Sequence, residues 1–307
     1  MEELKIDSPV KATPLPLWGD TEITKNLTAE RGRSAWLEPE GGLRGAARRH
    51  IRQEVSMTSM GEIIVNTFTR LVPQGEVTVP LWENARFILA DVPLKASQAR
   101  KILPWGMKLT GPPTATLFIA DYRKTGFTIP YKEAGALIHV KTAFGTGVHC
   151  CWMPVDDDTA LIYGRELLGY PKKLAKIEFE ETPESIKASV TRRGVTVLSM
   201  RGKRGEPQSS PDPVFDVKTF NVGGLGQLFA VSPVWLLRPI EVIHESYDAE
   251  VTVELNDSEI DPLAEFIEPG VISGRMAVTD IPGSYYMFPV GIAGVRWLSN
   301  TFSMRVR

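Results

Sequence analysis

The chain has 307 residues, of which 43% are hydrophobic and 23% are charged, with a formal net charge of −2. Such a length can bury a substantial core without a disulfide or a metal staple. The balanced charge gives no global field that would attract nucleic acid, and no apolar run reaches transmembrane length. We therefore expect no nucleic-acid partner and no membrane segment.

Residues 1–60 differ from the rest because they hold proline and glycine clusters and a basic stretch at 44–54. We predict an N-terminal extension or arm here, with one short helix, followed by one β-rich domain over 61–307. The basic stretch is either an anion or polynucleotide contact, or a solvated helix face or oligomer contact, and the balanced charge favours the second interpretation. The segment lacks the apolar run of a signal peptide, which favours a cytoplasmic protein.

Cys150 and Cys151 are the two cysteines, and they are adjacent. Neighbouring residues rarely meet disulfide geometry, so both are expected to be reduced, as is usual in the cytosol. The four histidines show no metal-ligand spacing, and the glycine clusters at 144–149 and 222–228 do not form a dinucleotide fingerprint. We expect no metal and no cofactor.

A helix is predicted at 95–103, with Leu94, Ala99, Ile102 and Leu103 as its buried stripe. A second helix is predicted at 258–266.

Short strand-like runs make up most of the remaining domain. They lie at 114–123, 136–144, 149–155, 159–164, 176–181, 185–190, 195–200, 271–281 and 291–298. A polar turn at 156–158 separates two of them, Arg192-Arg193-Gly194 reads as a hairpin turn, and Ser258 is the expected N-cap of the second helix. This succession predicts an α+β fold that is mostly antiparallel β, with a sheet that curls or closes into a β-barrel or cone and a few flanking helices.

The most informative segment is GRELLGYPKKLAK at 164–176. Gly169 allows a sharp bend, and Pro171 fixes one backbone angle. Lys172 and Lys173 follow. Neighbouring side chains of an extended segment point to opposite faces, so only one lysine can reach straight into a pocket. The other can still raise the local positive potential.

This segment resembles the active-site segment of the acetoacetate decarboxylase family, in which G-R-E and Y-P-K-K-L occur at this spacing. PYKEAGALI at 130–138 resembles the family segment that carries an active-site glutamate, here Glu133, and 85–104 is similar to the family's first strand and helix. The resemblance covers about residues 78–285. It implies an acetoacetate decarboxylase-like fold, a small keto-acid substrate and a homo-oligomer.

By this resemblance, Lys172 forms a Schiff base with the substrate, Lys173 tunes it, and Glu133 positions the substrate or carries a proton. A free lysine with a pKa of about 10.4 is almost wholly charged at neutral pH, yet only the neutral amine attacks a carbonyl. Desolvation or a second cation supplies the neutral amine, as is known for acetoacetate decarboxylase. The iminium is an electron sink, so a β-keto acid bound this way loses CO2 to give an enamine and then a ketone.

Arg165 and Glu166 belong to the same segment and are expected to be structural, as an ion pair under the lysine loop, with Tyr170 and Pro171 beside them. Candidate walls of the substrate pocket come from apolar strand runs around Phe118, Leu137, Val148 and Trp152. These four residues are interpreted either as substrate-binding walls, with Phe118 and Trp152 as the leading candidates, or as plain core.

The family carries an arginine near the pocket entrance, in the strand before the first helix. That position falls on Ala85, with Arg86 one step further. A shift of one residue turns a strand side chain to the other face. Either Arg86 is the substrate-binding cation or the chain lacks this arginine, and its absence favours an aldol reaction over decarboxylation.

Three functions remain in view. The first is a lyase that decarboxylates a β-keto acid such as acetoacetate to a ketone and CO2. The second is a pyruvate-dependent aldolase-dehydratase that uses the same lysine, because both reactions pass through an enamine. The third is a non-catalytic protein that binds a small acid, and the presence of both Lys172 and Glu133 argues against it.

Overall fold

The structure is a computed structural model that describes residues 81–223 and 232–306. The predicted N-terminal extension over 1–60, with its basic stretch, lies outside the described residues. The strands are β1 (Trp82–Pro93), β2 (Lys108–Leu109), β3 (Thr114–Tyr122), β4 (Lys124–Thr125), β5 (Tyr131–Thr142), β6 (Gly145–Val155), β7 (Lys172–Leu174), β8 (Lys176–Glu181), β9 (Ser185–Arg192), β10 (Val195–Pro207), β11 (Thr219–Val222), β12 (Pro233–Leu255) and β13 (Ser273–Ile292). The helices are α3 (Ala96–Ala99), the 3-10 helix η2 (Arg100–Ile102), α4 (Asp158–Glu166), α5 (Leu263–Phe266) and α6 (Val295–Val306).

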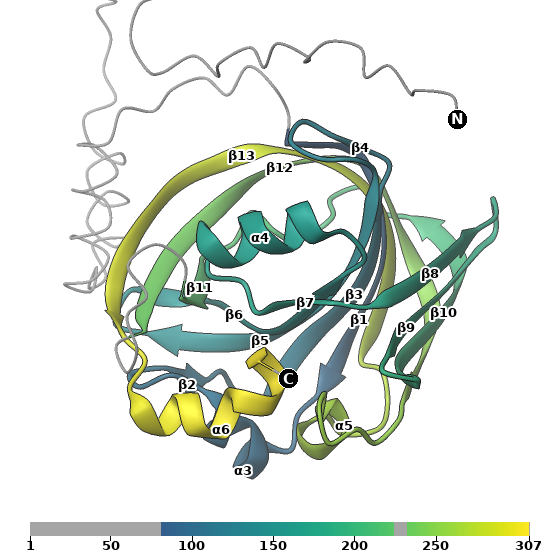
Figure 1. Cartoon of the computed structure of the whole chain (residues 1–307). Helices are drawn as coiled ribbons and strands as arrows, with labels where there is room; N and C mark the ends of the chain where they lie inside the picture. The colour runs from purple at the N-terminus through teal and green to yellow at the C-terminus, as the bar shows by residue number, and fades with distance from the viewer. Residues whose placement is uncertain (1–80, 224–231, 307) are drawn as a thin grey trace, which may run out of the picture. The chain divides into compact units, whose positions relative to one another are not determined.

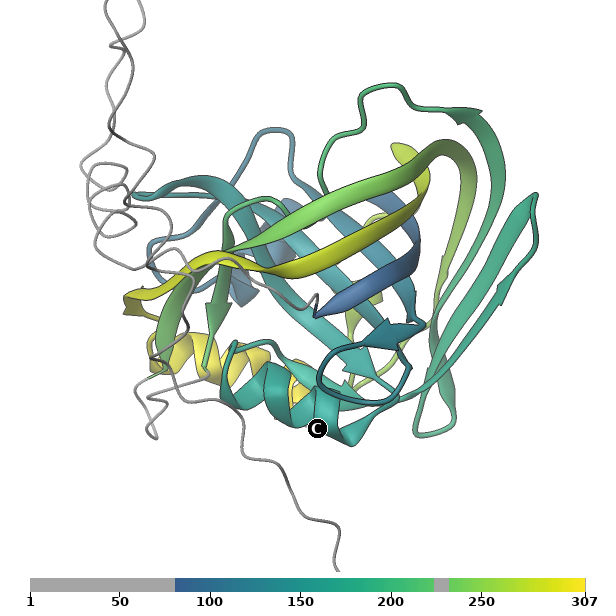
Figure 2. The same cartoon turned by 90° about the horizontal axis from the view of Figure 1, so that it is seen from above.

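The described strands form one sheet whose central part closes on itself (Figure 1). The order β11-β6-β5-β3-β1-β13-β12 returns to its start because β12 also pairs with β11. Strands β10, β9 and β8 continue the sheet beyond β12 as a wing, which is seen at the right of Figure 2. The described pairings are antiparallel except those of β6 with β11 and with β7. The prediction of a mostly antiparallel sheet that curls or closes, with few helices, is confirmed.

The inner face of this closed sheet carries apolar side chains from alternate positions of its strands, because successive side chains of a strand point to opposite faces. One apolar cluster takes Phe87 from β1, Phe118 from β3, Leu137 from β5 and Leu237 from β12. Since these strands surround a common interior, the cluster fills the inside of the ring. The candidate site lies among these side chains.

The outer face is covered by the short helices and by the wing of β8 to β10. Ile88 and Ile119, which alternate with the inner residues of β1 and β3, pack with Phe266 of α5 and Trp297 of α6. The indole of Trp297 also donates a hydrogen bond to the Ile102 carbonyl at 3.0 Å. Within the described residues, no helix is long and apolar enough to cross a membrane.

Several predicted elements are confirmed. The helix at 95–103 appears as α3 followed by η2, and its expected stripe of Leu94, Ala99, Ile102 and Leu103 is buried. The hairpin turn at 192–194 joins β9 to β10. Its second and third residues have φ angles of 46° and 85°, which suits the mirror-image turns that match strand twist.

Two predicted strands are wrong. Residues 159–164 belong to α4, because Asp157 caps this helix: its Oδ2 accepts the Ala160 N–H at 2.7 Å. The three consecutive aspartates therefore begin a helix rather than turn a hairpin. Residues 291–298 split between the end of β13 and the start of α6.

The predicted helix at 258–266 is much shorter than expected. Only Leu263–Phe266 is helical. Asp261 precedes Pro262, and the residue before a proline is disfavoured in helical conformation, so the helix starts after it. The Ser258 hydroxyl accepts the Asp261 N–H at 3.1 Å, within the turn that precedes the helix.

Candidate active site

Strand β7 sets the orientation of the two lysines. It runs parallel to β6, with Lys172 beside Met153 and Lys173 beside Pro154. Met153 belongs to the inner cluster, so Lys172 points into the ring and Lys173 points out of it. Lys172 is 4% exposed. Alternation, used at the sequence level, predicted that only one lysine reaches a pocket, and the structure places Lys172 there.

Glu133 meets Lys172 inside the ring. The Lys172 Nζ lies 2.6 Å from the Glu133 Oε2, and the two side chains are 5% and 6% exposed. Glu133 comes from β5, whose inner face also carries Tyr131. The two residues that the sequence resemblance named from separate segments thus form one buried ion pair.

Two tyrosines flank the carboxylate of this pair. The Tyr122 hydroxyl lies 3.4 Å from the Glu133 Oε1, and the Tyr131 hydroxyl lies 3.5 Å from the Glu133 Oε2. Trp82 donates its indole N–H to the Tyr131 oxygen at 2.8 Å, and the Lys172 Nζ stands 5.5 Å from the Tyr131 ring centroid. Burial, reinforced by the Glu133 carboxylate, raises the pKa of both tyrosines well above the ordinary value, so both remain hydrogen-bond donors.

Gly164 of α4 presses on the lysine stem. A Cβ added at this glycine would lie 2.4 Å from both the Cδ and the Cε of Lys172. Only hydrogen fits there, so the helix packs directly on the side chain that carries the amine. Sequence reasoning missed Gly164 because it placed the residue at the end of a strand; its position eight residues before Lys172 gave no sign of contact.

A cavity of about 250 Å³ surrounds the Nζ of Lys172. Its lining is mostly aromatic and aliphatic: Leu81, Trp82, Tyr122, Phe127, Met153, Tyr163, Leu167, Leu168, Tyr170, Phe215, Leu237, Pro239 and Ile281, with Ala160, Gly164, Gly283, Ser284 and the pair Glu133 and Lys172. Among these described lining residues, Lys172 is the one cation. A lysine and a carboxylate at this distance can pass a proton between them. The apolar walls around them would limit the access of water to a group bound there.

Lys173 lies on the outer side of β7, away from this cavity. Its Nζ forms an ion pair with Asp261, which is fully buried, and contacts the Ser303 carbonyl at 3.2 Å. Arg192 and the indole of Trp152 bind the same carboxylate at 2.8 Å each. Burial lowers the pKa of Lys173 to about 8 despite this carboxylate. The structure therefore separates Lys173 from the Lys172 site.

The other residues of the lysine segment hold the backbone. Arg165 donates from one guanidinium nitrogen to the carbonyls of Lys172 and Arg305, at 2.9 Å each. Glu166 is exposed, and among the described residues no ion pair joins it to Arg165, so the expected pair is not formed. Tyr170 is buried and lines the cavity, and Pro171 is buried beside it.

The three predicted substrate contacts lie elsewhere. Trp152 faces outward and packs in the core, which agrees with the alternative interpretation of plain core. Cys151 is an extra residue against the Ala136–Leu137 step of β5, and this bulge shifts the alternation of β6 by one position. Phe118 faces inward but packs edge-on against Phe215, which forms the wall in its place.

Arg86 is the third predicted contact. Its neighbours Ala85 and Phe87 point inward, so Arg86 points outward, where it lies 3.9 Å from Glu181. The inward position beside it is held by Ala85. The structure thus does not bring Arg86 into the cavity.

A family model for acetoacetate decarboxylase matches residues 68–289, which is most of the chain. The chain belongs to the acetoacetate decarboxylase family. It is similar to the acetoacetate decarboxylase of Burkholderia multivorans, at 25% identity over 210 residues that cover 64% of this chain and 83% of the relative. The resemblance inferred from the lysine and glutamate segments is confirmed. Family membership indicates an enzyme of the decarboxylase type or a related one.

Solved structures share the fold of this family member. The acetoacetate decarboxylase of Legionella pneumophila superposes with a TM-score of 0.62 at 17% identity, covering 75% of this chain and 96% of that one. The enduracididine biosynthesis enzyme MppR, solved in complex with pyruvate, gives a TM-score of 0.56 at 14% identity, covering 69% and 92%. At these identities the likeness concerns the fold alone.

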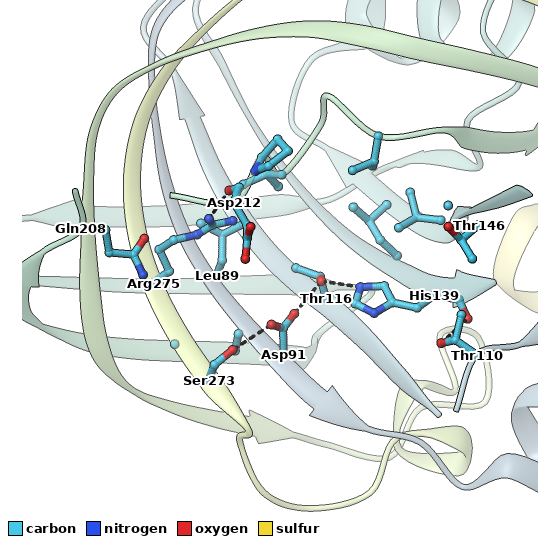
Figure 3. A pocket seen from close by; sticks show the side chains of 18 of the residues that line it. Leu89, Asp91, Thr110, Thr116, His139, Thr146, Gln208, Asp212, Ser273 and Arg275 are labelled. Carbon is cyan, nitrogen blue, oxygen red and sulfur yellow. Dashed lines mark hydrogen bonds between the residues drawn. The ribbon is translucent and has the colours of Figure 1, made fainter. Parts of the chain in front are cut away.

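A second cleft, about 580 Å³ in volume, is lined by a different set of polar side chains (Figure 3). Thr116 bridges His139 and Asp91, at 3.0 Å and 2.6 Å, and Ser273 donates to the same aspartate at 2.7 Å. Burial lowers the pKa of His139, so the ring is neutral near pH 7. Its described lining holds no lysine, unlike that of the Lys172 cavity.

No group of three or more His, Cys, Asp or Glu side chains in the described part of the chain could hold a metal ion. Cys150 and Cys151 are both free and buried. Burial raises the pKa of the Cys151 thiol to about 12, which keeps it protonated and unreactive.

Proposed function

We propose that this protein decarboxylates a β-keto acid through an iminium formed on Lys172. The observation that carries the proposal is the Lys172–Glu133 pair, with 2.6 Å between nitrogen and oxygen, buried in a largely apolar cavity. A lysine needs such surroundings to act as a nucleophile, because apolar walls disfavour its charged form and a nearby base can take its proton.

The steps follow from these two groups. Glu133 takes a proton from Lys172, and the neutral amine attacks the keto carbon. Water leaves, and the iminium draws the electron pair of the bond to the carboxylate, which departs as CO2. The resulting enamine is protonated at carbon, and hydrolysis then releases a ketone and the lysine. Glu133, with the Tyr122 and Tyr131 hydroxyls beside it, supplies and accepts the protons.

The described lining favours decarboxylation over the aldol alternative. A pyruvate carboxylate stays charged throughout an aldol reaction and needs a lasting partner. Lys172 is the one cation among the described lining residues, and the positive charge of its iminium is lost when the neutral enamine forms, so it is not a lasting partner. A β-keto acid instead loses its charge as CO2, which an apolar site assists. This loss of charge is a stronger reason than the expectation, drawn from resemblance, that absence of the entrance arginine favours the aldolase.

The test is reductive trapping. The protein is incubated with acetoacetate or pyruvate, treated with borohydride and digested, and the modified peptide is located by mass spectrometry while CO2 release is measured. We expect an adduct on Lys172 and CO2 from acetoacetate. The control variant Lys173→Gln keeps the adduct, and Lys172→Gln loses it. An adduct with pyruvate alone would support the aldolase-dehydratase, and an adduct on Lys173 would overturn the residue assignment.

Absence of any adduct in a folded sample would support the third alternative, a protein that binds a small acid without catalysis. A homo-oligomer in the cytoplasm stays a prediction from the resemblance and the cysteines, and size-exclusion chromatography with light scattering tests the oligomer.

A further inference from the structure

The wall of the cavity that lies across the ring from Lys172 is apolar. The lysine side is formed by β5, β7 and α4, which carry Glu133, Lys172 and Gly164. The opposite side comes from β12 and β13, which arch over α4 in Figure 1. Its described lining residues are Leu237, Pro239, Ile281, Gly283 and, at the exposed rim, Ser284.

This apolar wall is fixed in place by the inner cluster. Leu237 is 1% exposed and Ile281 is 5% exposed, and both pack with the side chains that fill the ring. Phe127 and Tyr163 add aromatic surface at the α4 side, with ring centroids 5.2 Å apart. The described part of this wall carries no charged group that could balance a buried charge.

From this arrangement we infer that the substrate is a β-keto acid whose keto carbon bears an alkyl or aryl group larger than the methyl group of acetoacetate. The inference rests on the proposed function. The carbonyl carbon must sit at the Lys172 Nζ, so one of its two substituents meets the β12–β13 wall. A carboxylate against Leu237 and Ile281 would be a buried charge without a partner, which is strongly unfavourable. The substituent at this wall is therefore the apolar one.

The size of the cavity agrees with this assignment. Its volume is about 250 Å³, which is close to the lower limit of about 300 Å³ for sites that hold drug-sized ligands. A four-carbon acid leaves much of that space empty, whereas an added chain of two to four methylenes would bury its surface against apolar side chains.

The experiment compares three substrates: acetoacetate, 3-oxohexanoate and 3-oxooctanoate. We expect kcat/KM for CO2 release to rise by about fourfold for each methylene buried, which gives about fifteenfold for 3-oxohexanoate. A preference for acetoacetate, or equal values for all three acids, would overturn the inference.

Two matched variants locate the effect. Leu237→Phe places a ring in the cavity and should bring the ratio of 3-oxohexanoate to acetoacetate toward one. Val242→Phe adds the same ring on the exposed face of the same strand and should leave the ratio unchanged, since Val242 is 47% exposed. Circular dichroism checks that both variants fold, and Ile281→Phe replaces the first if it does not. An unchanged ratio in the folded cavity variant would contradict the inference.

Borohydride trapping separates failure of this inference from failure of the proposed function. Adducts on Lys172 with all three acids, but no preference for the longer ones, would support the imine chemistry and contradict the inference of a larger substituent. No adduct with any of the three acids would contradict the proposed function itself.

Discussion

The Lys172 Nζ and the Glu133 Oε2 are 2.6 Å apart, so a change of one side chain affects the protonation of the other. Replacing Glu133 with Gln keeps the shape of the side chain but removes the group that takes the lysine proton. We expect Glu133→Gln to lower kcat for decarboxylation by about 10²- to 10⁴-fold, the usual contribution of a positioned base. The measurement is CO2 release, with the yield of the borohydride adduct as a second readout. Glu166→Gln, at an exposed position of α4, serves as the control and should change neither.

Gly164 offers a second test at the scale of a single residue. Gly164→Ala would place a methyl group 2.4 Å from the Cδ and Cε of Lys172, so the lysine must shift. A displacement of about 1 Å at a reacting group can cost about 10²-fold in rate, and we expect a loss of that order in kcat. Gly291→Ala, where no atom lies within 4 Å of the added Cβ, should keep full activity. Equal activity in the two variants would show that the glycine has no positioning role.

The sequence was sufficient to name the two members of the buried Lys172–Glu133 ion pair but not the residues around it. Alternation along β7 restricted the pocket to one of Lys172 and Lys173, and the family segments named Glu133. The sequence left Trp152 open between pocket wall and core, because a one-residue bulge is invisible to a pattern with a period of two. Gly164 was missed because its function depends on a contact between a helix and a strand, and no local pattern encodes that contact.

Strand β7 is also anchored from behind. Asp261 on the outer side accepts from Trp152 and pairs with both Lys173 and Arg192. Removing this carboxylate leaves two cations buried without it, so we expect Asp261→Ala to lower the free energy of unfolding by about 3–5 kcal/mol in urea denaturation. Lys176→Ala breaks the exposed pair with Glu178 and should leave the free energy of unfolding nearly unchanged. Similar values for the two variants would mean that the Asp261 network contributes little.

Elements with strong local patterns were predicted well, and those decided by capping were not. The alternation of β8 and β9 and the turn at 192–194 gave a correct hairpin. Residues 159–164 are apolar enough to pass for a strand, but Asp157 caps them as a helix by accepting a hydrogen bond from the Ala160 N–H. Residues 291–298 combine a strand end with a helix start, and their composition does not show where one gives way to the other.

Closure of the whole sheet depends on β11, a strand of four residues between β6 and β12. His149 of β6 ties this junction, because its Nδ1 lies 2.8 Å from the Phe220 carbonyl of β11. Burial lowers the pKa of His149 to about 4, against an ordinary value of 6.5. The sequence predicted that the sheet curls or closes, but not which strands close it, because the junction joins segments about 70 residues apart and the pairing of Thr219 with Leu237 has no local signature.

Acid should therefore loosen the molecule at this junction. Between pH 6.5 and about pH 4 the unfolded chain binds a proton at His149 that the folded chain does not, so stability is full above this range and falls as the pH is lowered through it. The contribution of this residue is up to about 3 kcal/mol. Unfolding free energies measured from pH 8 to pH 4 should show a weaker decline in His149→Gln than in the wild type. If the unfolding free energies of the two proteins fall equally with pH, groups other than His149 cause the acid sensitivity.

The opposite orientations of Lys172 and Lys173 also constrain the length of the chain between α4 and β7. Deleting or inserting one residue in 167–171 would shift β7 by one position against β6, and the two lysines would exchange faces. Lys173 would then enter the cavity, and Lys172 would face Asp261 in its place. Point substitutions in this connection keep the two lysines on their faces, whereas a change of length does so only in steps of two residues. Natural variation in this segment should therefore favour substitutions over single-residue insertions and deletions.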